Sequence, residues 1–268
     1  MSRLATLLLA CLFFCHPLPL RADEAPERLP TYQKRFERER PLVAVIGENS
    51  MTELVDYVLP YGLLKRSGVA EVVALSTRPG PMQMMPALHL LADGKVITTA
   101  GVSAAMPVSI ALVEAIAGTD RAQALATGIG LADWSPRHDG DAFALGAGGY
   151  LAAAGNLLSF WRHEELGLEV RQGEDELALA LRADAWSRTF RSEVLALAAD
   201  ASPIRTASGL VLLPEPMAAH PGITHLQPTD APLARLFDQT LGAIAERYDQ
   251  ATAALVAAQL EYAPALNE

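Results

Sequence analysis

The run Leu42–Gly47 constrains the fold of this chain more than any other sequence feature. Its six residues, Leu-Val-Ala-Val-Ile-Gly, are continuously apolar and rich in β-branched side chains, with no polar residue alternating between them. Such runs are typical of strands that are buried on both faces, as the strands of parallel sheets are. We therefore predict a parallel sheet and a fold of the α/β class.

A helix and a second strand are predicted directly after this run. Apolar residues recur at helical spacing from Leu54 to Leu64, and Gly68 follows them where a helix C-terminus favours glycine. Pro60 inside this segment is expected to kink or interrupt the helix. Residues 71–76 form the next apolar run and predict a strand. A strand-helix-strand unit with a right-handed crossover implies parallel pairing.

Beyond residue 76 the pattern predicts further elements: a turn at 78–81, a strand at 95–100, helices at 104–117 and 121–127, helices through 157–165 and 174–189, a strand at 194–199, a hairpin turned at Ser208-Gly209, and one or two helices in 231–260. The glycine-rich segment 146–149 is expected to be a boundary and a hinge. We expect an α/β part at 42–145 and a C-terminal α+β extension without internal repeats at 146–268.

The first 22 residues have the layout of a secretory signal peptide. A short basic start, Met1–Arg3, precedes the apolar run Leu4–Cys15, which is too short to span a bilayer, and a helix-breaking stretch ends in the small residue Ala22. We expect cleavage after Ala22 and a secreted or periplasmic protein that has no membrane segment after cleavage. A lipoprotein attached through Cys11 and an uncleaved anchor are the alternatives.

Cysteine usage limits the chemistry of the mature protein. The chain has two cysteines, Cys11 and Cys15, and both lie in the predicted signal peptide. The remaining chain therefore offers no disulfide, no cysteine metal ligand and no thiolate nucleophile. Its stability is expected to come from an apolar core.

Composition supplies that core and argues against one class of partner. Hydrophobic residues make up 51% of the chain and charged residues 19%, which excludes disorder as the dominant state. The net charge of −10 is a poor match to phosphate backbones, so we expect no nucleic-acid partner. Residues 23–41 read as a polar leader arm, and their mixed-charge run at 34–40 is expected to be solvated.

Several stretches of the chain carry a resemblance to a known family. They are Val43–Asn49, Glu53–Pro60, Ile97–Ala105 and Ala111–Glu114. Together they resemble the ThiJ/PfpI family, also called the DJ-one superfamily, a class I glutamine-amidotransferase-like group, over about residues 42–145. Residues 184–189 and 259–262 look like the C-terminal extension of an exported bacterial subgroup. The resemblance implies a doubly wound parallel sheet flanked by helices.

The resemblance also implies where catalysis would occur and what is missing. Active family members carry a cysteine at a strand-to-helix elbow, a nearby histidine and an acid on the first helix; Asp56 matches the acid. The chain passes almost directly from Leu88 to the segment starting at Lys95, where the family holds its central strands and the elbow. We therefore expect a truncated doubly wound sheet. Its strand edges and apolar faces should be covered by the C-terminal half of the chain or by a partner subunit.

These considerations predict a non-catalytic binding or structural module without a cofactor. Its expected partners are a second copy of the chain or a small-molecule ligand. The alternative is a weak serine- or carboxylate-dependent hydrolase that uses Ser103, His138 and Asp56, because Ser103 lies in Gly101–Ala105 between a predicted strand and helix. We favour a helix-capping role for Ser103, since Ala105 replaces the second glycine of a nucleophile elbow.

Histidines and tryptophans complete the candidates. His138, Asp139 and Asp141 are the residues that a metal ion would use, with His220 and His225 as a further pair, but neither spacing follows a helical zinc pattern. We therefore expect no metal. Three tryptophans, at positions 134, 161 and 186, are predicted to fill gaps in the core or between domains.

Overall fold

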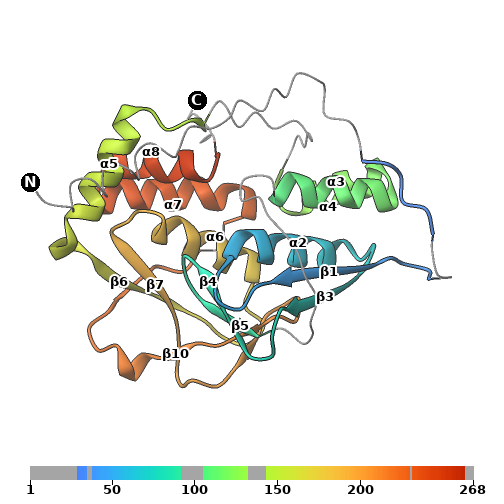
Figure 1. The fold of residues 1–268 in the computed structure, drawn as a ribbon, viewed down its shortest axis with the longest axis horizontal. Coiled ribbons are helices and arrows are strands. Elements are labelled where there is room, and N and C mark those ends of the chain that lie inside the picture. Colours follow the sequence, from blue (N-terminus) through green and yellow to red (C-terminus); the bar gives the residue numbers. More distant parts are fainter. Residues whose placement is uncertain (1–28, 35–37, 92–104, 132–142, 230, 263–268) are drawn as a thin grey trace, which may run out of the picture.

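The structure is a computed structural model, and it describes residues 29–34, 38–91, 105–131, 143–229 and 231–262. It is a mixed α/β fold with parallel strand pairs (Figure 1). β1 (Leu42–Gly47) pairs in parallel with β3 (Glu71–Ser76), and α2 (Leu54–Ser67) connects them after the short strand β2 (Thr52–Glu53). The predicted parallel strand-helix-strand unit is confirmed.

The details of this unit agree with the sequence-based expectation in one respect and differ in others. Gly68 ends α2 in the left-handed conformation, with φ of 67°, as predicted, and Pro60 does not interrupt the helix, so the predicted break is absent. Leu59 and Tyr61 on either side of Pro60 are buried, so tertiary packing holds this turn helical. β1 pairs only with β3 among the described residues, and Leu42 is half exposed, so the prediction of a strand buried on both faces was wrong.

A β-hairpin follows the unit. β4 (Pro81–Met85) and β5 (His89–Leu91) pair antiparallel, and β2 adds to β4 in parallel. The predicted strand at 95–100 lies outside the described residues. The chain continues into α3 (Ala105–Ala117) and α4 (Thr119–Gly128), which agree with the predicted helices, and Gly118 with φ of 87° separates the two.

The same order of elements then occurs a second time. β6 (Glu164–Glu169), α6 (Glu176–Ser187) and β7 (Ser192–Ala198) form a parallel strand-helix-strand unit, and the hairpin of β8 (Ile204–Arg205) and β9 (Val211–Leu212) follows it. The C-terminal half therefore repeats the order of elements of the N-terminal half, a relationship that the sequence analysis did not predict. A predicted helix through residue 165 was also wrong, because α5 (Ala147–Leu158) and the 3-10 turn Phe160–Arg162 end before β6 begins.

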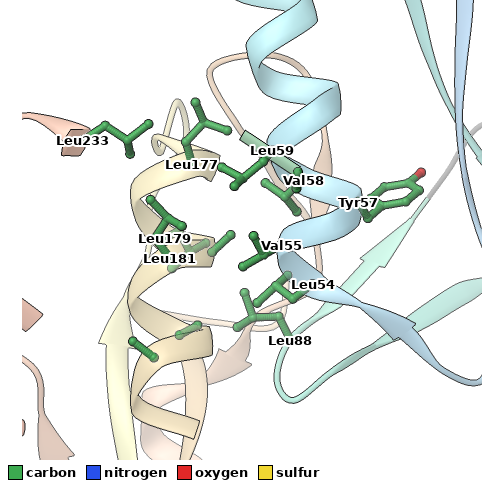
Figure 2. Packing of buried hydrophobic residues seen from close by; sticks show 14 of the residues in the cluster. Leu54, Val55, Tyr57, Val58, Leu59, Leu88, Leu177, Leu179, Leu181 and Leu233 are labelled. Atoms are coloured by element: carbon green, nitrogen blue, oxygen red, sulfur yellow. The ribbon is translucent and has the colours of Figure 1, made fainter. Parts of the chain in front are cut away.

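The two units face each other across an approximate two-fold axis. β5 and β9 pair antiparallel, with Leu90 opposite Leu212. α2 packs against α6, and Figure 2 shows Leu59 of α2 opposite Leu177 of α6, while Tyr57 points to the other side of α2. The N-terminal and C-terminal halves therefore pack directly on each other through these contacts.

The remaining elements extend the second unit. A four-stranded parallel sheet in the order β10-β7-β6-β11 is completed by the short strands β10 (Glu215–Pro216) and β11 (Thr224–His225). The 3-10 turn Met217–Ala219 lies between these two strands in the chain. α7 (Leu233–Arg247) packs on α6, α8 (Gln250–Gln259) packs on α7, and α5 packs on α8 (Figure 1). The glycines at 146–149 begin α5 rather than forming a hinge loop. Within the described ranges, no helix has the length and apolar character that a membrane span needs.

Candidate functional site

The predicted family acid lies at the interface between α2 and α6. Asp56 is in the first turn of α2, and Glu53 is the N-cap of that helix, where its carboxylate accepts a hydrogen bond from the Asp56 backbone N–H at 2.7 Å. Asp184 and Arg188 approach from the C-terminal end of α6. We call these four residues the acid–arginine cluster.

Arg188 connects the two helices within this cluster. Its Nε donates to Asp184 Oδ1 at 2.9 Å and to Oδ2 at 2.8 Å, and its Nη2 donates to Glu53 Oε1. The Asp184 side chain is fully buried, and the side chains of Arg188 and Glu53 are 16% and 13% exposed. Breaking such a buried ion pair leaves an uncompensated charge, so the cluster ties α2 to α6.

The two carboxyl groups that share Arg188 hold protons more firmly than exposed acids do. Burial raises the pKa of Glu53, and the nearby charge of Asp184 raises it further. Burial also raises the pKa of Asp184, against the lowering effect of Arg188. Because the two carboxyls interact, they titrate as a pair, and the pair retains a proton at a pH where exposed carboxyls have lost theirs.

A second set of charges occupies the corresponding place at the other end of the same interface. Arg66, near the C-terminus of α2, donates to Asp175 Oδ1 at 2.5 Å and to Glu176 Oε1 at 3.3 Å at the N-terminus of α6. Glu176 also accepts a hydrogen bond from the Ser208 backbone N–H at 3.0 Å. Glu53 and Asp175 are the N-caps of α2 and α6, so the pairs Arg188–Glu53 and Arg66–Asp175 relate the two helices symmetrically, which favours a structural role for both.

The chemistry open to the acid–arginine cluster is proton binding. The chain carries no cysteine beyond residue 15, so none of the described residues places a thiol beside Asp56. The cavities that described residues line around Tyr61, Asn156 and His163 include none of the four cluster residues. Sequence reasoning missed Glu53, Asp184 and Arg188, although the spacing of Asp184 and Arg188 by four helical positions was a usable signal.

The other predicted site residues have mixed outcomes. Ser103, His138, Asp139 and Asp141 lie outside the described residues, as does Trp134, so the serine constellation and the metal set remain predictions. Trp186 is buried as predicted, but Trp161 is 71% exposed, which contradicts its predicted core role.

The second pair of candidate histidines, His220 and His225, lies beside carboxylates. His220 Nε2 lies 2.6 Å from Glu215 Oε2, and His225 Nδ1 lies 3.1 Å from Glu169 Oε1. The two histidines thus have different carboxylate partners. The described part of the chain holds no group of three or more potential metal ligands.

An exposed apolar surface on α5 is a second candidate site. Helix α5 contains no charged residue, and its sequence is Ala-Gly-Gly-Tyr-Leu-Ala-Ala-Ala-Gly-Asn-Leu-Leu. Its large side chains and those of the following 3-10 turn are exposed: Tyr150, Leu151, Leu157, Leu158, Phe160 and Trp161. We call these six residues the α5 surface. Figure 1 places α5 at one end of the molecule beside α8.

The spacing of the α5 surface explains why it stays open. Positions 150, 151, 157 and 158 recur at helical intervals and share one face, whereas Asn156, on the opposite face, is buried and donates to Thr252 Oγ1 of α8 at 3.0 Å. A helix that is apolar on all sides is normally buried on all sides. In this chain one side packs on α8, and the other carries side chains such as Leu151, which is 74% exposed.

Comparison of the chain with family models, with curated proteins and with solved structures finds no match.

Proposed function

We propose that this protein is an exported, non-catalytic ThiJ/PfpI-like module that acts by binding, and that its α5 surface pairs two copies of the chain. The observation that carries the proposal is the exposed apolar α5 surface. A binding role is further supported by the absence of cysteine beyond residue 15 and by the position of Asp56 in a cluster that links two helices. Export is supported by the signal-peptide layout of residues 1–22.

The fold that accompanies this proposal is a truncated doubly wound sheet, present as two related units. Support comes from the parallel β1–β3 pair with its α2 crossover and from the parallel β6–β7 pair with its α6 crossover. Each unit covers an apolar helix face of the other. In this proposal the two units of one chain bury each other's apolar faces, so the shortened sheet needs no partner subunit. The α5 surface is then the place where a second molecule binds.

The size of the α5 surface fits a second copy of the chain. Its three aromatic and three leucine side chains expose on the order of 900 Å², compared with ~300–600 Å² for the largest apolar patch of an ordinary monomer. A standard interface buries about 800 Å² on each partner. Two α5 surfaces placed face to face therefore supply the area of one isologous dimer interface.

Charge also favours a second copy over a lipid surface. The chain has a net charge of −10, and helices that bind anionic membranes carry Lys and Arg beside their apolar face. α5 carries none, so it has little electrostatic attraction for such a membrane. Two copies of an acidic chain repel each other through their like charges. An uncharged helix is the part of the surface where the two copies meet without that repulsion.

Sedimentation velocity of the purified protein tests the proposal. The wild-type chain should sediment as a dimer at micromolar concentration, and Leu158→Glu should shift it to monomer because a charge would be buried at the interface. Met51→Glu is the matched control, because Met51 is 63% exposed away from α5 and this variant should stay dimeric. A wild-type protein that is monomeric at all concentrations, or dimerisation that Leu158→Glu leaves unchanged, would refute the proposal.

A further inference from the structure

A cavity of about 270 Å³ lies in the seam between α5 and α8. Its polar lining comes from Asn156, Ser159, Arg162, Arg191, Asp249 and Thr252. The volume corresponds to about nine water molecules at roughly 30 Å³ each, which is the size of a small metabolite. The cavity lies on the side of α5 that faces α8, so it is separate from the α5 surface.

Arg191 is the unusual residue of this cavity. The residue is only 7% exposed, and its guanidinium carbon lies 4.2 Å from the centroid of the Tyr248 ring. Its Nε is buried without a hydrogen-bond partner, and within the described part of the chain its side chain forms no ion pair closer than 4 Å. Arg188 and Arg247, by contrast, each hold a carboxylate directly.

A buried guanidinium without an acceptor is costly. Buried polar groups in native proteins almost always have a partner, and a buried charge is normally paired. The ring of Tyr248 offsets part of this cost through a cation–π contact but supplies no acceptor for Nε. The nearby carboxylate of Glu164 is already engaged, because it accepts from Arg247 Nε at 2.8 Å and from the Tyr248 hydroxyl at 2.7 Å.

The charges around the cavity favour a singly charged anion. Arg162 and Asp249 are exposed residues of opposite sign in its lining, so they largely cancel. One Asp249 oxygen accepts from the Thr252 backbone N–H at 2.7 Å. The net positive charge of the cavity lining is thus the charge of Arg191. Arg191 also borders a second cavity of about 470 Å³, but Glu164, Glu165 and Glu193 line that cavity and disfavour an anion there.

We propose that the cavity between α5 and α8 binds a small organic monocarboxylate through Arg191. The guanidinium fork of an arginine matches a carboxylate with two parallel hydrogen bonds. Asp249 in the lining disfavours a doubly charged phosphate. This inference does not depend on the pairing of two chains through α5.

Titration with acetate tests the proposal, with sodium chloride as the matched salt at constant ionic strength. Ligand-observed NMR should report saturable acetate binding, whereas methyl acetate, the neutral analogue, should not bind. Arg191→Lys keeps the charge but loses the fork, so the Kd for acetate should rise at least about tenfold. Arg182→Lys is the control, because Arg182 donates to the carbonyl of Gln227 outside this cavity.

Two further arms keep the test decisive. If Arg191→Lys fails to fold, Arg162→Gln takes its place, because Arg162 is an exposed residue of the same cavity. Arg162→Gln should weaken acetate binding severalfold. The control Arg78→Gln, at an exposed position outside the cavity, should leave acetate binding unchanged. Inorganic phosphate should bind more weakly than acetate. Absence of saturable acetate binding, tighter binding of phosphate, or acetate binding that no variant at Arg191 or Arg162 alters would overturn the proposal.

Discussion

Leu90 on β5 pairs with Leu212 on β9, and the two residues hold equivalent positions in the two units of the chain. The segments around them read Leu-His-Leu-Leu at 88–91 and Leu-Val-Leu-Leu at 210–213. Both leucines are buried, at 3% and 0% exposure. The approximate two-fold axis therefore passes through the core between these strands, so the stability of each unit depends on the other.

Truncation of this pair should reveal that dependence. Leu90→Ala and Leu212→Ala should each lower the free energy of unfolding by about 2–5 kcal/mol, because each leaves a cavity. The double variant should lose less than the sum, since the two side chains belong to one contact. Urea unfolding measures all three. Leu42→Ala, at a half-exposed edge, should change stability little. Strict additivity would contradict a shared core.

Gly62 tests the close approach of α2 and α6. A Cβ at this position would lie 2.6 Å from Leu177 Cδ2 and 3.0 Å from Glu176 Oε1. Gly62→Ala should therefore destabilise the protein by about 1–3 kcal/mol through overpacking, although alanine is the better helix former. Gly242→Ala on α7 is the matched control: its Cβ meets nothing within 4 Å, so helix propensity should stabilise by up to about 1 kcal/mol. Thermal unfolding of both variants should give opposite signs.

Removal of Arg188 should be far more damaging than removal of an exposed arginine. Arg188→Met leaves two buried carboxyls without their cation and should cost about 3–5 kcal/mol. The Arg38–Glu71 pair is about half exposed, at 46% and 49%, so Arg38→Met should cost less than about 1 kcal/mol. Chemical denaturation compares the two, and equal losses would argue against the acid–arginine cluster as a tie between the helices.

The pH dependence of stability should carry the signature of Glu53. Burial raises the pKa of this carboxyl in the folded state, so the folded protein binds a proton that the unfolded chain releases. Stability from this group therefore falls as pH rises from about 4, the ordinary carboxyl range, through the raised pKa. Glu53→Gln mimics the protonated form and should gain stability relative to wild type over that window. A difference in the free energy of unfolding between the two proteins that is the same at every pH would exclude the effect.

Local signals in the sequence predicted much of the fold. Gly68 and Ser208-Gly209 mark a helix end and a hairpin turn because few residues adopt their backbone conformations, and the structure has both features. The repeat was missed because its two strand-helix-strand units share little sequence outside the short segments 88–91 and 210–213. β6 contains Gly167 and three glutamates, so it lacks the apolar run that identifies β1. Gly167 is required there because a Cβ would lie 2.5 Å from Leu197 Cδ1.

The sites depended on long-range contacts that sequence patterns do not contain. Asp56 was singled out because it matches the acid of the family that the chain resembles, but its neighbours Asp184 and Arg188 lie more than a hundred positions away along the chain. Trp161 was expected in the core because large aromatic residues usually are buried, and its exposure became evident only when α5 was seen to pack with one side on α8.

Cross-linking through position 154 tests the pairing of two chains most directly. Ala154 is exposed near the middle of the α5 surface, and its equivalents should meet near the axis of an isologous dimer. With Cys11 and Cys15 replaced by serine, Ala154→Cys should form a disulfide-linked dimer under mild oxidation, and the added change Leu158→Glu should prevent it. Ser202→Cys, exposed beyond β7, is the control. Cross-linking of Ala154→Cys no faster than that of Ser202→Cys would contradict the account.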